Sequence, residues 1–203
     1  GGDIRDCLQK VAELSNWKKN RTNASARQPT PHLRRGWGMA AMLEGYGLGR
    51  DVPDCGGIEL EMARDGSVTV RTGAVDYGQG LHTILMQMTA EALGVDVTTV
   101  RLIPPDTQKS VDAGSTSASR QTFISGNALL KASEAIKRSL LETAAEFTHL
   151  QVGQLSLHGG FLFSNNKKLG ITIAALAEKA WNKNRPLSAL GHYGMEYHAE
   201  VFS

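Results

Sequence analysis

Hydrophobic residues recur at helical spacing in the first part of the chain. Between residues 3 and 21, apolar side chains fall three or four positions apart, and Asp3 precedes them where its carboxylate can cap the first helical amides. This pattern predicts an amphipathic helix that packs on one face. The residues that follow, as far as residue 35, are rich in turn formers and contain two prolines, which predicts a connector.

Strand patterns come next along the chain. Residues 36–47 are glycine-rich and apolar, which is typical of a buried strand that its neighbours approach closely. Between residues 58 and 70 the apolar side chains alternate with polar ones on both sides of Asp65-Gly66, a pair that favours a tight turn. We therefore expect a strand followed by a β-hairpin.

Helical spacing returns twice in the following segment. One apolar stripe runs over residues 81–92 and meets Gly94, a typical residue at the end of a helix. Residues 97–103 then predict a strand that ends before two prolines. A second stripe, from about Arg120 to His149, predicts the longest helix.

The last part of the chain predicts a second hairpin and a short helix. Residues 154–166 alternate around two glycines, Thr172 can cap a helix that runs to Trp181, and residues 194–203 begin a final strand. Because strands are interspersed with helices and hairpins, the expected fold is α+β, with a mixed or antiparallel sheet and hairpins packed by helices.

We interpret the chain as one sub-domain in three parts. Residues 1–35 form the N-terminal helix and connector, residues 36–150 the core that carries the functional loops, and residues 151–203 a hairpin, a short helix and a truncated strand. The sequence opens without Met and stops inside an alternating stretch, so we expect a piece of a longer protein.

Composition and charge narrow the class of protein. The 22 basic and 20 acidic residues give a net charge of +2, without the basic clustering typical of nucleic-acid binders, so no nucleic-acid partner is expected. Cys7 and Cys55 form no C-x-x-C motif, and no histidine has metal-ligand spacing, which argues against a disulfide framework or a metal site. No apolar run reaches the length of a membrane span. These features predict a reduced, cytoplasmic, soluble protein with no membrane contact.

One candidate for chemistry is the stretch DYGQGLHT, residues 76–83, between a predicted strand and a predicted helix. Its glycines permit a close approach of a ligand, and the first amides of the following helix are expected to be free donors. The amide of Gln79 offers both donors and acceptors, which suits the edge of a heterocycle. The alternative is a strand-to-helix turn that needs glycine for structural reasons alone.

A second candidate is the stretch AGSTSASRQT, residues 113–122, directly before the longest predicted helix. Hydroxyls, backbone amides and the positive end of the helix dipole converge there, which suits a diphosphate. Arg120 could bind a phosphate through two parallel donors. The alternative is that Ser119 only caps the helix while Arg120 points to water.

Three stretches together, residues 70–95, 100–122 and 125–140, closely resemble the molybdenum-binding subunit of the xanthine dehydrogenase and aldehyde oxidoreductase family. The shared features are a glycine-glutamine-glycine turn before a helix ending in LGV, a strand ending in Asp-Thr, and a G-x-T-x-A-S-R loop before a helix opening near GNA. Residues 3–17 and 191–203 match more loosely, so the resemblance covers essentially the whole chain.

This resemblance implies a molybdopterin enzyme that hydroxylates an aldehyde or a nitrogen heterocycle with oxygen derived from water. It implies molybdopterin with molybdenum, in bacteria usually as the cytosine dinucleotide. It also implies partners: the remainder of the molybdenum subunit, iron-sulfur and FAD subunits or domains, and a small-molecule substrate. The residues expected to bind the pterin and dinucleotide are Gly78, Gln79, Gly80, Ser117, Ala118, Ser119, Arg120 and Gln121.

Several family motifs are absent from the sequence. The family's catalytic base is a glutamate in a Gly-Glu-Pro segment, and Phe-Arg-Gly and Gly-Gly-Gln motifs lie near its substrate and metal; none of the three occurs here. We therefore assign no catalytic and no metal-binding residue, and we expect the isolated chain to be inactive. The alternative function is a non-catalytic module that binds another phosphate-bearing ligand or a protein partner.

Overall fold

A computed structural model describes residues 3–23, 30, 32–33, 36–42, 45, 47–49 and 52–195 of the chain. These residues belong to two compact units, Gly1–Glu44 and Gly45–Ser203. The sub-domain boundaries at residues 35 and 150 that we infer from the sequence stay predictions. Within the described part, none of the helices combines the length and hydropathy that a membrane span requires.

The first unit contains two short helices where the sequence predicts one. They are α1 (Ile4–Leu14) and α2 (Trp17–Thr22), and they are separated at Asn16, which has a left-handed φ of 49°. The predicted cap is confirmed, because the Asp3 carboxylate accepts a hydrogen bond of 2.8 Å from the amide of Arg5.

The strand predicted over residues 36–47 is wrong for every residue of that range that the structure describes. Residues 36–42 are exposed and pair with no strand. A strand needs a partner for its backbone groups, and the local pattern carries no information about whether one exists.

A four-stranded mixed sheet forms the base of the second unit. Its strands are β1 (Asp54–Met62), β2 (Val68–Arg71), β3 (Val100–Ile103) and β7 (Ser188–Met195). In the order β3-β2-β1-β7, β1 pairs antiparallel with both β2 and β7, whereas β2 and β3 are parallel. The predicted α+β fold and the hairpin around Asp65-Gly66 are therefore confirmed.

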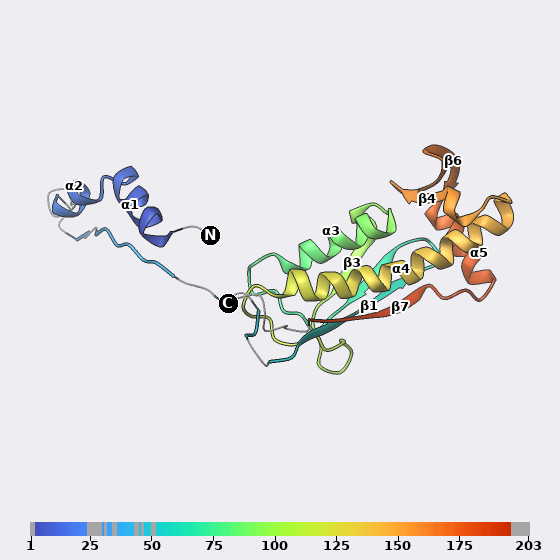
Figure 1. Cartoon of the computed structure of the whole chain (residues 1–203), viewed down its shortest axis with the longest axis horizontal. Helices are drawn as coiled ribbons and strands as arrows, with labels where there is room; N and C mark the ends of the chain where they lie inside the picture. The colour runs from blue at the N-terminus through green and yellow to red at the C-terminus, as the bar shows by residue number, and fades with distance from the viewer. Residues whose placement is uncertain are drawn as a thin grey trace, which may run out of the picture. The chain divides into compact units, whose positions relative to one another are not determined.

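Two long helices cover one face of this sheet, as Figure 1 shows. They are α3 (Leu81–Leu93) and α4 (Gln121–Thr148), both close to their predicted positions. Gly94 ends α3 with a left-handed φ of 71°, as predicted. α3 connects the parallel strands β2 and β3 and packs against α4. The loop before α3 and the loop before α4 therefore each lead into a helix of the same layer.

A smaller antiparallel sheet packs at one end of α4 (Figure 1). It contains β4 (Leu155–His158), β5 (Phe161–Ser164) and β6 (Lys167–Thr172), and is followed by α5 (Ile173–Asn182). The hairpin and the Thr172 cap are confirmed, the latter by a hydrogen bond of 3.1 Å from the Ala175 amide. The sequence analysis missed β6, which begins with two exposed lysines, has no regular alternation and follows a left-handed turn at Asn165-Asn166.

Two strand boundaries differ from the prediction. The strand predicted from Val97 begins at Val100, because the Asp96 carboxylate accepts from the amide of Thr98 and closes a 3-10 turn over Val97–Thr99. The strand predicted from residue 194 begins at Ser188. Its predicted continuation over residues 196–203 lies outside the described residues.

Candidate functional site

The two loops that the sequence analysis singled out are in direct contact. The backbone amide of Val75 donates to Oγ1 of Thr116 at 2.9 Å. The hydroxyl of Tyr77 donates to the carbonyl of Thr116 at 3.4 Å. Side chains about forty positions apart in the sequence therefore share one surface.

A recess lies between the approaches to the two loops, that is, the segments that directly precede the loops in the sequence. Its volume is about 350 Å³. It is lined by Gly73, Val75, Pro105, Asp106, Thr107, Ser110, Val111 and Asp112. The recess is within the size range of small-molecule sites, and both approaches contribute to its wall.

The glycine turn, residues 76–80 directly before α3, is closed by hydrogen bonds to the carboxylate of Asp76. Asp76 accepts hydrogen bonds from the amides of Gly78 at 2.9 Å, Gly80 at 3.2 Å and His82 at 3.0 Å. These amides, above all that of Gly78, lower the pKa of Asp76 from its ordinary value. Among the first amides of α3, that of His82 is therefore already occupied by a side chain of the same turn, and the expectation of a free donor is wrong for this residue.

The glycines of this turn are needed for its backbone conformation. Gly78 and Gly80 have φ values of 119° and 82°, which side chains rarely tolerate. A Cβ at either position would meet no other atom within 4 Å. The turn therefore leaves open space beside its backbone.

Gln79 is exposed and its amide is held by its own turn. Oε1 accepts from the amide of Tyr77 at 2.9 Å, and Nε2 donates to the carbonyl of Val75 at 3.0 Å. An amide side chain has two donor hydrogens and two acceptor lone pairs, so one of each remains for a ligand. The orientation of this amide is thus fixed before any ligand arrives.

The serine loop, residues 113–120 directly before α4, contains strained backbone. Ala118 and Ser119 have left-handed φ values of 51° and 52°, a conformation that costs a non-glycine residue about 1–3 kcal/mol. No side chain caps α4, whose N-cap residue is Arg120. The alternative in which Ser119 caps the helix is therefore wrong.

Five consecutive backbone amides in this loop, Ser115–Ser119, donate no hydrogen bond to any described residue. Ser115, Ser117 and Ser119 are exposed, whereas Ala118 is half-buried. The loop therefore presents free amides and hydroxyls at its surface.

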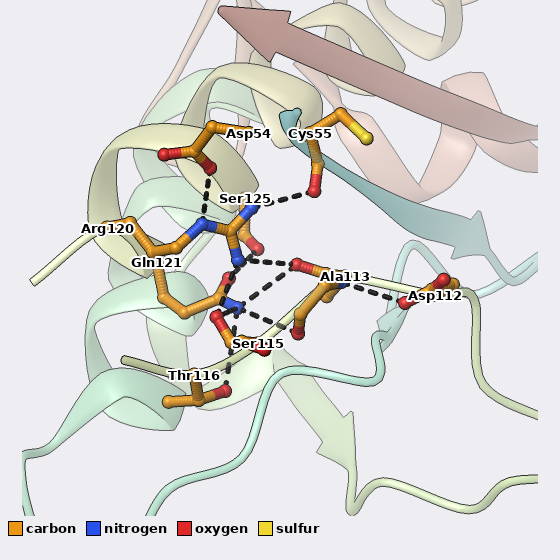
Figure 2. Close-up of polar contacts among 10 residues, drawn as sticks. Asp54, Cys55, Asp112, Ala113, Ser115, Thr116, Arg120, Gln121 and Ser125 are labelled. Atoms are coloured by element: carbon orange, nitrogen blue, oxygen red, sulfur yellow. Dashed lines mark hydrogen bonds and ion pairs between the residues drawn. The ribbon is translucent and has the colours of Figure 1, made fainter. Parts of the chain in front are cut away.

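Arg120 and Gln121 are buried, and Figure 2 shows their side chains directed at the backbone of Ala113 and Ser115. Arg120 is 1% exposed, and its guanidinium forms an ion pair with the Asp54 carboxylate and donates to three carbonyls. The alternative in which Arg120 points to water is therefore wrong. A phosphate contact through this guanidinium stays a prediction that the inward orientation does not favour.

The sequence analysis missed three residues of the site. Asp76 has a local signal, because an aspartate two positions before a glycine favours a side-chain-closed turn. Asp54 and Thr116 have no such signal, since their partners Arg120 and Val75 are 66 and 41 positions away.

The chain is similar to known proteins over most of its length. The molybdopterin cofactor-binding domain family matches residues 10–202. The xanthine dehydrogenase molybdenum-binding subunit of Escherichia coli O157:H7 is 32% identical over 160 residues, which cover 78% of this chain and 21% of that protein. The gamma subunit of the 6-hydroxypseudooxynicotine dehydrogenase complex of Paenarthrobacter nicotinovorans is 30% identical over 159 residues, covering 78% and 19%. The chain thus spans about a fifth of the length of these relatives.

Solved structures share the fold. Quinoline 2-oxidoreductase from Pseudomonas putida 86 has a TM-score of 0.61 at 17% identity, covering 93% of this chain and 25% of that chain. The Cu,Mo-CO dehydrogenase has a TM-score of 0.62 at 19% identity, covering 95% and 26%. Together with the family match, these findings identify the chain: it belongs to the molybdopterin cofactor-binding domain family, of the xanthine dehydrogenase and aldehyde oxidoreductase type.

Proposed function

We propose that this segment binds the pterin and dinucleotide portions of a molybdopterin cofactor within a larger molybdenum hydroxylase. The observation that carries the proposal is the run of free amides at Ser115–Ser119, beside the glycine turn. Free amides in a turn next to a helix start are a favourable site for phosphate oxygens. The residues present therefore fit a phosphate-bearing cofactor.

The two loops have different chemistry in this proposal. The Asp76 carboxylate sits in the amides of the glycine turn, so a phosphate placed there would meet a negative charge. Gln79 and the backbone of Gly78 and Gly80 would instead lie against the neutral pterin ring. The phosphates would bind the amides and hydroxyls of Ser117 and Ser119.

Gln121 keeps a place in the site through its backbone. Both the Arg120 and Gln121 side chains are buried, and the Gln121 side-chain amide donates to the Ala113 carbonyl at 3.1 Å. The Gln121 backbone amide opens α4, where the helix dipole favours an anion, whereas the Arg120 backbone amide donates to the Ser117 carbonyl and supports the loop. Ala118 contributes its backbone amide in the same way.

The activity of the whole protein is part of the proposal. The bound molybdenum cofactor supplies the redox centre at which an aldehyde or nitrogen heterocycle is hydroxylated with oxygen from water. This chain would bind and orient the cofactor. The rest of the molybdenum subunit would supply the base in a Gly-Glu-Pro segment, and iron-sulfur and FAD partners would receive the electrons. We place the complex in the cytoplasm, where the exposed free thiols of Cys7 and Cys55 would stay reduced.

A titration with cytidine 5′-diphosphate tests the proposal. We expect amide chemical-shift changes in the ¹⁵N-labelled protein at Ser115–Ser119, and weaker changes at Gln79. The double substitution Ser117→Ala/Ser119→Ala should weaken binding at least about tenfold, since two hydroxyl donors to the phosphate oxygens are lost. Ser156→Ala, at an exposed position of β4, is the matched control and should bind like wild type.

A second titration, with guanosine 5′-diphosphate, separates the cytosine form from other ligands. Guanosine 5′-diphosphate should bind more weakly than the cytidine compound if the segment accepts the cytosine dinucleotide. Equal binding of both would reject the cytosine form. Shift changes outside the two loops, with none at Ser115–Ser119, would instead favour a module for an unrelated phosphate ligand.

A further inference from the structure

The serine loop owes its outward-facing amides to the way its carbonyl groups are held. The carbonyl oxygens of Gly114 and Ser115 accept from the Gln121 amide at 3.4 Å and from Nη1 of Arg120 at 2.6 Å. In a trans peptide unit the C=O and the following N–H point in opposite directions. The amides of Ser115 and Thr116 are thereby directed away from the protein interior.

The next three carbonyls are also bound, one by the exposed Tyr77 side chain and two by backbone amides. The carbonyl of Thr116 accepts from the Tyr77 hydroxyl, that of Ser117 from the Arg120 amide, and that of Ala118 from the amide of Gly47 at 3.0 Å. All peptide bonds are trans in the described residues. Five consecutive carbonyls are thus bound by the protein, and the five opposing amides of Ser115–Ser119 have no partner among the described residues.

Arg120 and Gln121 together support this loop from its inner side. The Arg120 guanidinium donates to the carbonyls of Ala113 at 2.9 Å, Ser115 at 2.6 Å and Cys55 at 2.7 Å, and its Nε–H pairs with Asp54. Four of its five N–H groups therefore have protein acceptors. Figure 2 shows these contacts converging on one buried point.

Gly114 shows how closely the loop is wrapped around this side chain. A Cβ at Gly114 would lie 3.1 Å from both terminal guanidinium nitrogens of Arg120 and 2.8 Å from the Cys55 carbonyl oxygen. Only glycine fits between the guanidinium and the end of β1. The loop and the Arg120 side chain are therefore matched in shape as well as in hydrogen bonding.

The Asp54 carboxylate fixes the direction of this guanidinium. Both partners are buried, at 2% and 1% exposure. A buried ion pair gains little net stability, because both charges lose their hydration, and its best-supported use is to select one conformation. The pair joins the first residue of β1 to the residue before α4, so it ties the loop to the central strand of the sheet.

From these contacts we infer that Asp54 and Arg120 are positioning residues for ligand binding by the serine loop. Their side chains touch no ligand; the guanidinium that Asp54 orients holds the carbonyls of Ala113 and Ser115, and these two anchors set the path of the loop that carries the Ser115–Ser119 amides. The inference deepens the proposed function and rests on it only for the identity of the ligand. The arrangement of the amides belongs to the ligand-free protein and can be measured there.

Two isosteric or charge-conserving variants, Asp54→Asn and Arg120→Lys, test the inference. Asn keeps the shape of Asp but removes its charge, and Lys keeps the charge but lacks the planar fork that reaches several acceptors at once. We expect both variants to shift the amide resonances of Ser115–Ser119 in the ligand-free ¹⁵N-labelled protein. Each should weaken the binding of cytidine 5′-diphosphate about tenfold, the cost of a partly misplaced loop.

A double-mutant cycle strengthens the test. If Asp54 and Arg120 act as one unit, the double variant should bind cytidine 5′-diphosphate as tightly as the single variant that has the lower affinity. Arg185→Lys is the matched control, because Arg185 also pairs with a carboxylate, that of Glu142, but lies between α5 and β7. It should leave both the loop resonances and the affinity unchanged.

The inference fails if the Ser115–Ser119 resonances of ligand-free Asp54→Asn overlay those of wild type and its affinity stays within about twofold. If wild type does not bind the nucleotide at all, the proposed function fails, while the ligand-free spectra still decide the positioning role. Should either variant not fold, amide hydrogen exchange on wild type replaces it. The five loop amides should then exchange faster than the helical amides of α4, and slow exchange would overturn the inference.

Discussion

At the scale of single residues, two carboxylates bind donor groups in and beneath the two loops. Asp54 orients Arg120 from inside the protein, and Asp76 fills the amides of the glycine turn. Asp54 lies outside the three stretches that resemble the family most closely, whereas Asp76 lies inside one of them, two positions before its glycine-glutamine-glycine motif. A residue that holds a loop in place can therefore lie outside the motif of that loop.

The hydrogen bonds to Asp76 predict that the free energy of unfolding of the protein depends on pH. The pKa of Asp76 is lowered in the folded protein, chiefly by the Gly78 amide, so its ionised form stabilises the fold above the ordinary pKa of 3.8. This stabilisation is lost as the pH falls through the lowered pKa. The difference in the free energy of unfolding between wild type and Asp76→Asn should be constant above about pH 5 and shrink below pH 3.8.

Urea unfolding at several pH values measures this difference. Glu134→Gln, on the exposed face of α4, serves as the control. A difference that grows as the pH is lowered would contradict the assignment of Asp76 as the acceptor of these amides.

At the scale of elements, close contact between α4 and β7 determines how α4 packs on the four-stranded sheet. β7 runs so close to α4 that a Cβ at Gly191 would lie 1.8 Å from the carbonyl oxygen of Ala128. Hydrophobic side chains of α4, including Leu129, Ile136 and Leu140, are fully buried in the core. The helix that carries the serine loop is therefore held rigidly on the sheet.

Gly191→Ala tests this close approach. Because the helix backbone cannot move aside without disturbing the core, we expect the free energy of unfolding to fall by about 3 kcal/mol. Gly153→Ala is the matched control, since a Cβ there would meet nothing within 4 Å, and its effect should stay below about 0.5 kcal/mol. Equal stabilities of the two variants in chemical unfolding would show that the approach is less close.

At the scale of the whole molecule, the hydrophobic core belongs to one unit. Every buried hydrophobic residue in the described part of the chain lies between Ile58 and Leu187, inside Gly45–Ser203. None of the residues of α1 and α2 is buried. The second unit thus has a core of its own.

A chain reduced to residues 45–203 should fold by itself. Since its core is complete, we expect the free energy of unfolding of this unit to change by less than about 1 kcal/mol on removal of residues 1–44. Thermal and urea unfolding followed by circular dichroism measure the change. A reduced chain without a cooperative transition would contradict the prediction.

The helices and hairpins could be predicted because their signals are local. Gly94 ends α3 and Thr172 caps α5 through contacts within a few positions. The strand expected at residues 36–47 and the missed strand β6 show the limit. Strand formation depends on a partner elsewhere in the chain. Neither the glycine-rich apolar residues 36–47 nor the residues of β6, which lack regular alternation, reveal whether that partner exists.

The sequence by itself determined the α+β fold class, most elements and the two loops that the family shares. Only the tertiary structure decided how those loops are built: Arg120 turns inward to Asp54, 66 positions away, and Asp76 occupies the glycine turn. The physical reason is that backbone propensities and motifs act over a few residues. The direction of a side chain, and hence which donors remain free, depends on packing between distant segments.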